Sequence, residues 1–213
     1  MTTTGRSWAA LTALIVAAGI VVQLIVTANG NDGFFPDNPD RVFNVFAYFT
    51  IQSNLLLGGT TVMLALQPDR PQSTLFRTLR LNSVLCIAVT GIVYHLALAP
   101  LDDLSGWAAV ANFLLHSAAP LAGVLGWLLF GPRGRTGSRV VAWSVVFPLL
   151  WLAFTLIRGE FVGFYPYPFV DVTEHGYARV LLNCLLVAVL FLALAAGTTA
   201  LDRRLHQKTT VER

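Results

Sequence analysis

The sequence predicts an all-α membrane protein in which residues 1–213 form a single domain of six transmembrane helices. Hydrophobic residues make up 55% of the 213-residue chain and charged residues only 12%, whereas ordinary soluble domains carry about 25% charged residues. The apolar residues also gather into runs of roughly 20, the length of helix that crosses ~30 Å of hydrocarbon. Each run is continuous rather than alternating with polar residues, which favours a helical bundle over a β-barrel.

The runs cover residues 8–28, 43–66, 82–101, 107–130, 140–158 and 177–200. We expect the first to be a helix rather than a cleaved signal peptide, because no A-x-A-like site precedes the polar turn at 29–33. Prolines are expected to kink two runs, at Pro120 in the fourth and Pro148 in the fifth. The connections between runs are short and leave no room for a soluble domain.

Charged residues divide between the two ends of the predicted bundle. Eleven of the 14 basic residues lie at Arg6, in the 67–81 and 131–139 connections and in the tail after 200, and eight of the 11 acids lie in the opposite connections. The positive-inside rule therefore places both termini in the cytoplasm, with the chain in the plasma (inner) membrane. This asymmetry also accounts for the net charge of +3, so no nucleic-acid partner is expected.

Polar side chains interrupt the runs at a similar depth. Counted at ~1.5 Å per residue, they fall in the outer half of the membrane, and the inner half has almost none. On the second, third and fourth helices, Thr50, His95 and His116 share a face with small residues, the kind of face that packs inward in membranes. The pattern predicts a polar pocket in the outer-leaflet half that opens to the outer surface. Its candidate residues are Thr50, Ser53, Asn54, Tyr94, His95, Asn112, His116, Arg158 and Asn183.

Several interpretations fit this pocket. Thr, Ser and Asn side chains often only bond between helices or to their own helix carbonyls, and Arg158 lies near enough to the boundary to reach the interface. No closely spaced set of His, Cys and carboxylate ligands is present, so neither a metal nor a cofactor is expected, although a haem between His95 and His116 is a further alternative. Thr50 and His116, at similar depth, could also serve as a nucleophile and its base.

If Thr50 and His116 act as nucleophile and base, hydrogen-bond donors for the developing oxyanion are available at the same depth. Asn54, Asn112 and Asn183 are candidates to stabilise an oxyanion, and Arg158 is a candidate to hold a substrate carboxylate.

Three segments of the sequence resemble a known family. They are YFTIQSN (48–54), LLHSAAPLAG (114–123) and LIRGEFVGFYPYPFVDV (156–172). Over about 40–200 the chain resembles the bacterial six-helix branch of the androgen-induced membrane protein family, which includes the mammalian androgen-induced and androgen-dependent TFPI-regulating proteins. The mammalian members are intramembrane threonine hydrolases that cleave fatty acid esters of hydroxy fatty acids. The resemblance implies Thr50 and His116 as the essential threonine and histidine.

The YPYPF segment belongs to the bacterial pattern of this resemblance. Pro166 and Pro168 predict an extended backbone over 165–169. Its aromatic residues, Tyr165, Tyr167 and Phe169, are either anchors at the membrane interface or part of a lid over the pocket.

Two functions follow as hypotheses. The first is an intramembrane lipid-ester hydrolase that takes its lipid substrate from the bilayer, with Thr50 as nucleophile and His116 as general base. The alternative is a non-catalytic binding protein or transporter for an amphipathic carboxylic acid, in which Arg158 holds the carboxylate. Transport requires a polar path to the cytoplasm, and the scarcity of polar residues in the inner half argues against one.

Overall fold

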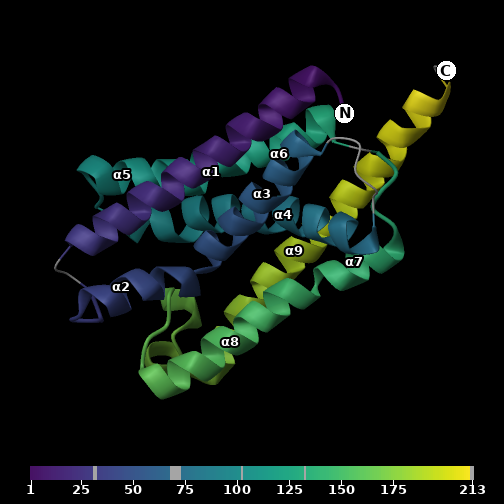
Figure 1. Ribbon diagram of the computed structural model, residues 1–213. Helices are drawn as coiled ribbons and strands as arrows, with labels where there is room; N and C mark the ends of the chain where they lie inside the picture. Colours follow the sequence, from purple (N-terminus) through teal and green to yellow (C-terminus); the bar gives the residue numbers. More distant parts are fainter. Residues whose placement is uncertain (31–32, 68–72, 102, 132, 212–213) are drawn as a thin grey trace.

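The computed structural model of the protein describes residues 1–30, 33–67, 73–101, 103–131 and 133–211, with side chains to Gln207. The regular elements in these ranges are helical, and they confirm the predicted all-α fold. Six stretches are long and apolar enough to cross a membrane: Thr3–Asn29, Phe49–Leu66, Thr74–Leu101, Gly106–Phe130, Ser138–Val162 and Val172–Gln207. Both chain termini lie at the same end of the bundle (Figure 1). Among the charges used for the orientation, Asp32, Arg70, Asp102 and Arg213 lie outside the described residues.

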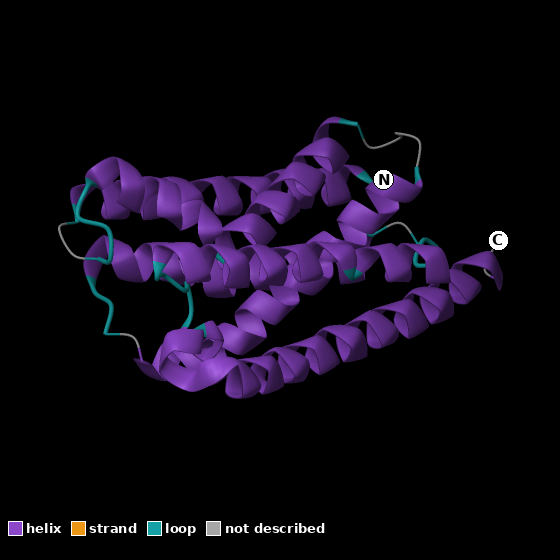
Figure 2. Ribbon diagram, turned by 90° about the horizontal axis from the view of Figure 1, so that it is seen from below, coloured by secondary structure: helices purple, strands orange, loops and turns teal. Residues whose placement is uncertain are grey.

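The bundle has a well-packed part and a looser part. In chain order the helices are α1 (Thr3–Asn29), α2 (Asn38–Asn44), α3 (Phe49–Leu66), α4 (Thr74–Val93), α5 (Gly106–Phe113), α6 (Ala119–Phe130), α7 (Ser138–Ser144), α8 (Val146–Val162) and α9 (Val172–Val211). α1 packs on α3, α5 and α6, and α4 packs on α3 and α6. α8 and α9 run beside this group on one side, and the long loops lie at the two ends (Figures 1 and 2).

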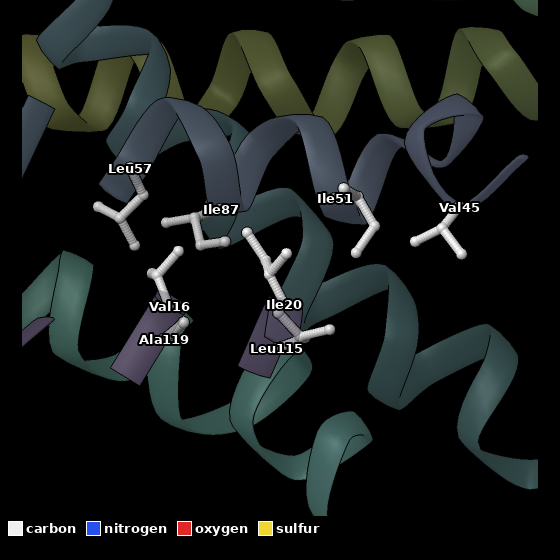
Figure 3. Close-up of a cluster of buried hydrophobic side chains, with 8 residues drawn as sticks. All are labelled: Val16, Ile20, Val45, Ile51, Leu57, Ile87, Leu115 and Ala119. Carbon is white, nitrogen blue, oxygen red and sulfur yellow. The ribbon is translucent and has the colours of Figure 1, made fainter. Parts of the chain in front are cut away.

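A buried apolar cluster holds the well-packed part together. It joins α1, the start of α3, α4 and the centre of the fourth spanning stretch, and it seats α3 against the segment that carries His116. Figure 3 shows these side chains meeting between the helices. The members are Val16, Ile20, Val45, Ile51, Leu57, Ile87, Leu115 and Ala119.

The second spanning stretch is not the continuous helix that was expected over 43–66. After α2 the chain forms a 3-10 turn, η1 (Val45–Ala47), then Tyr48 adopts an extended conformation (ψ 134°), and α3 begins at Phe49. Thr50 therefore lies in the first turn of a helix rather than in the middle of one.

Backbone carbonyls freed at this break have side-chain partners. The Gln52 amide donates to the Phe46 carbonyl at 3.0 Å, and the Trp151 indole donates to the Ala47 carbonyl at 3.0 Å. Unsatisfied backbone groups are costly where water is scarce, so Gln52 and Trp151 stabilise the interruption.

Two spanning stretches each contain a π turn, η2 (Tyr94–Leu98) and η4 (Leu114–Ala118). A proline follows each turn by two residues, Pro100 after η2 and Pro120 after η4. Proline has no N–H, and its ring crowds the carbonyl four residues earlier. A widened turn before the proline relieves the crowding, and such turns are frequent at functional sites. The predicted distortion at Pro120 thus takes the form of a π turn. At Pro148 the helix is interrupted three residues earlier, at Val145, between α7 and α8.

The third spanning stretch begins earlier than the expected residue 82. Ser73 caps α4, because its hydroxyl accepts the Phe76 N–H at 3.2 Å, and the helix starts at Thr74. Arg77 and Arg80, expected in a loop, are therefore helical. Arg80 is buried, with 8% of its surface exposed, so its assignment to a surface connection was wrong.

The half of the bundle nearer the termini contains more buried polar side chains than expected. Most of their hydroxyls bond back to carbonyls of their own helix, as Thr61 does to Leu57 at 2.8 Å. These side chains thus stabilise helices rather than line a wide path, and a cavity among them measures only about 10 Å³. The residues include Thr12, Thr60, Thr61, Asn82 and Ser83.

The last two spanning stretches are longer than predicted. α8 continues to Val162 and ends at Gly163, whose left-handed conformation (φ 72°) reverses the chain, so Arg158 lies one turn inside the helix. α9 begins at Val172 and bends at Gly176 (φ 70°).

Asp202 of α9 fixes the loop between α6 and α7. Its carboxylate is 1% exposed and accepts the backbone N–H groups of Gly134 (3.0 Å), Arg135 (2.8 Å) and Thr136 (3.1 Å). The Thr136 hydroxyl donates a fourth bond at 2.8 Å. Gly134 has φ 68°, which lets successive N–H groups converge on one anion.

Candidate active site

The Thr50 hydroxyl and the His116 imidazole meet inside the bundle. Thr50 Oγ1 lies 3.1 Å from His116 Nε2. α3 presents Thr50 from its first turn, and η4 presents His116 from the widened turn before Pro120. Thr50 is 7% exposed and His116 is half-buried, so the pair lies inside the bundle.

The second nitrogen of His116 fixes its tautomer. Nδ1 lies 3.2 Å from the Asn112 carbonyl oxygen. Because a carbonyl only accepts, Nδ1 carries the proton, and in the neutral ring Nε2 is the acceptor that faces Thr50. This is the arrangement of a general base whose orientation is held by a third group.

A third side chain, Tyr167, completes the arrangement from the loop between α8 and α9. Its hydroxyl accepts the Thr50 backbone N–H at 3.0 Å and lies 3.1 Å from Thr50 Oγ1. With the Thr50 proton directed at His116, the Tyr167 hydroxyl donates to Thr50 Oγ1. Burial raises the pKa of Tyr167 to about 12, so it stays a neutral donor at physiological pH.

Gly159 allows this loop to fold back against α8. A Cβ atom at Gly159 would lie 2.1 Å from the Tyr165 ring, closer than two carbon atoms approach. The Tyr165 and Tyr167 side chains are buried, at 7% and 8% exposure. These buried positions do not fit aromatic anchors at the membrane interface, one of the two interpretations of the YPYPF segment, since the Tyr167 side chain points inward to Thr50.

Two other aromatic and amide groups support His116. The Tyr94 ring stacks on the imidazole with centroids 4.1 Å apart, an arrangement that favours a cationic ring. The Asn112 amide donates to the Tyr94 hydroxyl at 2.5 Å. Asn112 thus positions Tyr94, and this amide N–H does not point to a substrate.

The remaining predicted amides are engaged in the framework. Asn54 donates to the Thr50 carbonyl (2.8 Å) and to the Leu115 carbonyl (3.2 Å). A π turn would pair Leu115 with residue 120, which is a proline, so Asn54 replaces the missing donor. Asn183 donates to the Phe169 carbonyl at 2.9 Å and holds the loop. These bonds leave neither side chain facing Thr50 as an oxyanion donor.

Ser53 and His95 also lie outside the reacting group. The Ser53 hydroxyl pairs with Thr90 at 2.8 Å and joins α3 to α4. His95 is exposed and its Nε2 lies 3.0 Å from the Ser117 hydroxyl. The Tyr94 ring is in contact with both His95 and His116, so the two imidazoles do not face each other across a gap wide enough for a haem.

A cavity of about 620 Å³ opens from the site toward the end of the bundle opposite the termini. His116 and Thr50 form its floor, and its mouth is lined by loop residues 33–35, 101, 104, 164 and 166–168. We call it the outer cavity. Its polar lining includes Gln23, Thr27, Arg41, Asn44, Tyr48 and Asn112.

Two arginines lie beside the outer cavity. Arg158 donates to the Asn44 amide oxygen at 2.8 Å and lies over the Phe35 and Phe164 rings at 5.7 Å each. It therefore lies behind the wall that Asn44 and the two rings form. Arg41, which the sequence did not single out, lines the cavity itself and bonds the Gly30 carbonyl at 2.9 Å.

A second cavity of about 160 Å³ reaches Thr50 from the other side. Residues of α4, α8 and α9 line it, and the two cavities share Thr50, Tyr94, Leu98 and Tyr167. We call it the apolar cavity, because its described lining contains no charged residue.

The chain matches no protein-family model, no curated protein and no solved structure. Membership of the androgen-induced family therefore stays a prediction from the three segments.

Proposed function

We propose that the protein is an intramembrane lipid-ester hydrolase with Thr50 as nucleophile and His116 as general base. The observation that carries this proposal is the 3.1 Å contact between Thr50 Oγ1 and an imidazole nitrogen whose partner nitrogen donates to a backbone carbonyl. The resemblance of the sequence to threonine hydrolases of fatty acid esters supports the same reaction. Under the predicted orientation, the site lies in the outer-leaflet half of the plasma (inner) membrane.

The first half-reaction forms an acyl-threonine. Thr50 Oγ1 attacks the ester carbonyl carbon while His116 Nε2 takes its proton, which gives a tetrahedral oxyanion and an imidazolium. His116 then returns the proton to the ester oxygen as the carbon–oxygen bond breaks, and the alcohol leaves. The Tyr94 ring and the Asn112 carbonyl stabilise the transient cation.

Two features favour the negative charge that develops at the carbonyl oxygen. The first turn of α3 places the positive end of a helix dipole at Thr50, and the Tyr167 hydroxyl is a neutral donor beside the nucleophile. In the second half-reaction, water from the outer cavity attacks the acyl-threonine while His116 takes its proton. His116 then returns this proton to Thr50 Oγ1 as the bond to the acyl carbon breaks, which releases the fatty acid and restores Thr50 and neutral His116.

A transport function receives less support. The outer cavity lies at one end of the bundle, and the cavity at the other end measures about 10 Å³.

Covalent labelling tests the proposed function directly. A fluorophosphonate should phosphonylate Thr50, with loss of fluoride and transfer of the Thr50 proton to His116. Peptide mass spectrometry of the wild type should locate the adduct on 49–54, and Thr50→Ala should abolish both labelling and ester hydrolysis. Thr61→Ala, which removes a buried hydroxyl bonded to Leu57 in the same helix, is the matched control. A wild-type protein that neither labels nor hydrolyses esters of any chain length refutes the proposal.

Replacing Tyr167 by phenylalanine should lower kcat by about 10²-fold, the usual effect of one lost oxyanion donor. The pH profile distinguishes its role from that of His116. Activity should fall in acid, because a protonated His116 accepts no proton from Thr50. It should stay level to about pH 10, because the pKa of Tyr167 is raised to about 12. Tyr167→Phe should lower the plateau without moving the acid limb; a moved limb would assign Tyr167 to the positioning of His116.

A further inference from the structure

The apolar cavity has the properties of a hydrocarbon site. Valine, leucine and phenylalanine side chains dominate its walls. The hydroxyls that reach it already have partners: Thr90 pairs with Ser53, Tyr94 accepts from Asn112, and Thr50 pairs with Tyr167. A guest would find no unpartnered hydroxyl there, and apolar cavities of this size stay dry and bind hydrocarbon.

The mouth of this cavity faces the side of the bundle. Leu149 of α8 and Leu192 of α9 line it although they are 57% and 52% exposed, so it opens between these two helices. α8 is largely exposed on its outer side, and Thr155 and Gly159 are its buried residues. In a membrane the lateral surface of the bundle meets lipid chains, whereas the outer cavity opens among the loops at one end of the bundle.

The position of His116 decides which part of an ester each cavity holds. His116 lines the outer cavity and not the apolar one. The group that protonates the leaving alcohol must reach the ester oxygen, so the alcohol part lies on the His116 side of Thr50. The acyl chain then extends from the carbonyl carbon in the other direction, into the apolar cavity.

We propose that the apolar cavity between α4, α8 and α9 binds the acyl chain of the substrate, and that the chain enters sideways from the bilayer between α8 and α9. The assignment of an acyl chain rests on the proposed hydrolase function; the binding of a hydrocarbon chain does not.

Ala188 offers a way to shorten the cavity. It lines the cavity from α9 and is exposed, so a larger side chain there projects into the opening rather than into packed core. Ala188→Phe should lower kcat/KM for a dodecanoyl ester by at least ~10-fold relative to a butyryl ester of the same alcohol, the effect of about two methylenes left unburied. Ala188→Leu should give a smaller shift. Ala193→Phe, at an exposed position of α9 that does not line the cavity, should keep the wild-type preference.

A binding measurement separates this inference from the hydrolase proposal. A fatty acid with a terminal diazirine, photolysed with the full-length protein in phosphatidylcholine vesicles, should crosslink within 145–152 and 184–192. Ala188→Phe should reduce these crosslinks by about 10-fold, and Ala193→Phe should not. If the wild type hydrolyses no ester but shows this pattern, the reaction fails and the chain site stands. Crosslinks spread evenly over the lipid-facing helices, or an equal loss for both esters in Ala188→Phe, overturn the inference.

Discussion

Replacing His116 by glutamine should reduce kcat for lipid-ester hydrolysis by at least ~10³-fold. Glutamine can keep a polar contact with Thr50, but it takes up no proton, so the nucleophile loses its base and the leaving alcohol loses its acid. KM should change little, because the proposed binding mode places the acyl chain in the apolar cavity, which His116 does not line. Turnover of a dodecanoyl ester by purified protein in detergent measures both constants.

His95→Gln is the matched control for this experiment. His95 lies on the neighbouring π turn, is exposed, and lines neither cavity. Its replacement should leave kcat within a factor of about two. Equal losses in the two variants would show that histidine at these turns serves folding and not the reaction.

Replacing Asp202 by alanine should produce the largest loss of stability of any single polar substitution proposed for this chain. Three backbone N–H groups and one hydroxyl converge on its carboxylate, which is 1% exposed. Buried donors without an acceptor cost ~1–3 kcal/mol each, so several kcal/mol are at stake. Thermal unfolding in detergent should show Tm lowered by about 10 °C. Asp202→Asn, which keeps one acceptor oxygen, should give an intermediate value.

Asp171 provides the comparison for Asp202. Its carboxylate also gathers several donors, from the Thr173 N–H and hydroxyl and from the Glu174 N–H, but these bonds are exposed. Water can replace them, so Asp171→Ala should cost about 1 kcal/mol, as for an ordinary helix cap. A similar fall in Tm for both variants would contradict the role assigned to burial at Asp202.

Continuous apolar runs were enough to predict the helices, because a helix is the structure that satisfies its own backbone in lipid. Depth and helical phase were enough to bring Thr50 toward His116, although the chain breaks before Thr50 at Tyr48 and widens at His116 into a π turn. The helix ends were less predictable. Because Ser73 caps α4, the helix begins earlier than predicted and includes the buried Arg80. The break at Tyr48 depends on a hydrogen bond from Trp151, a residue about 100 positions away.

Tyr167 illustrates the limit of local patterns at the site. It is 117 positions from Thr50 in the chain, and its aromatic neighbours resemble an ordinary interface belt. Gly159 is a sequence feature that could have indicated the folded-back loop, because the Tyr165 ring occupies the position of a Cβ atom at this residue of α8. For Asn54 the predicted direction was correct but the predicted role was not. Its amide faces the interior, where it donates to the Leu115 carbonyl, which has no backbone donor because residue 120 is a proline.

The π turn that carries His116 has a geometric consequence for the whole fourth span. It accommodates one residue more than a regular turn, and each helical residue adds ~100° of rotation. The π turn therefore rotates the side chains of α6 about the helix axis relative to those of α5. α5 can hold Asn112 against Tyr94 beside the outer cavity while α6 presents Ala119 and Gly123 to its neighbours, so the site and the tight packing can vary independently along a single transmembrane segment.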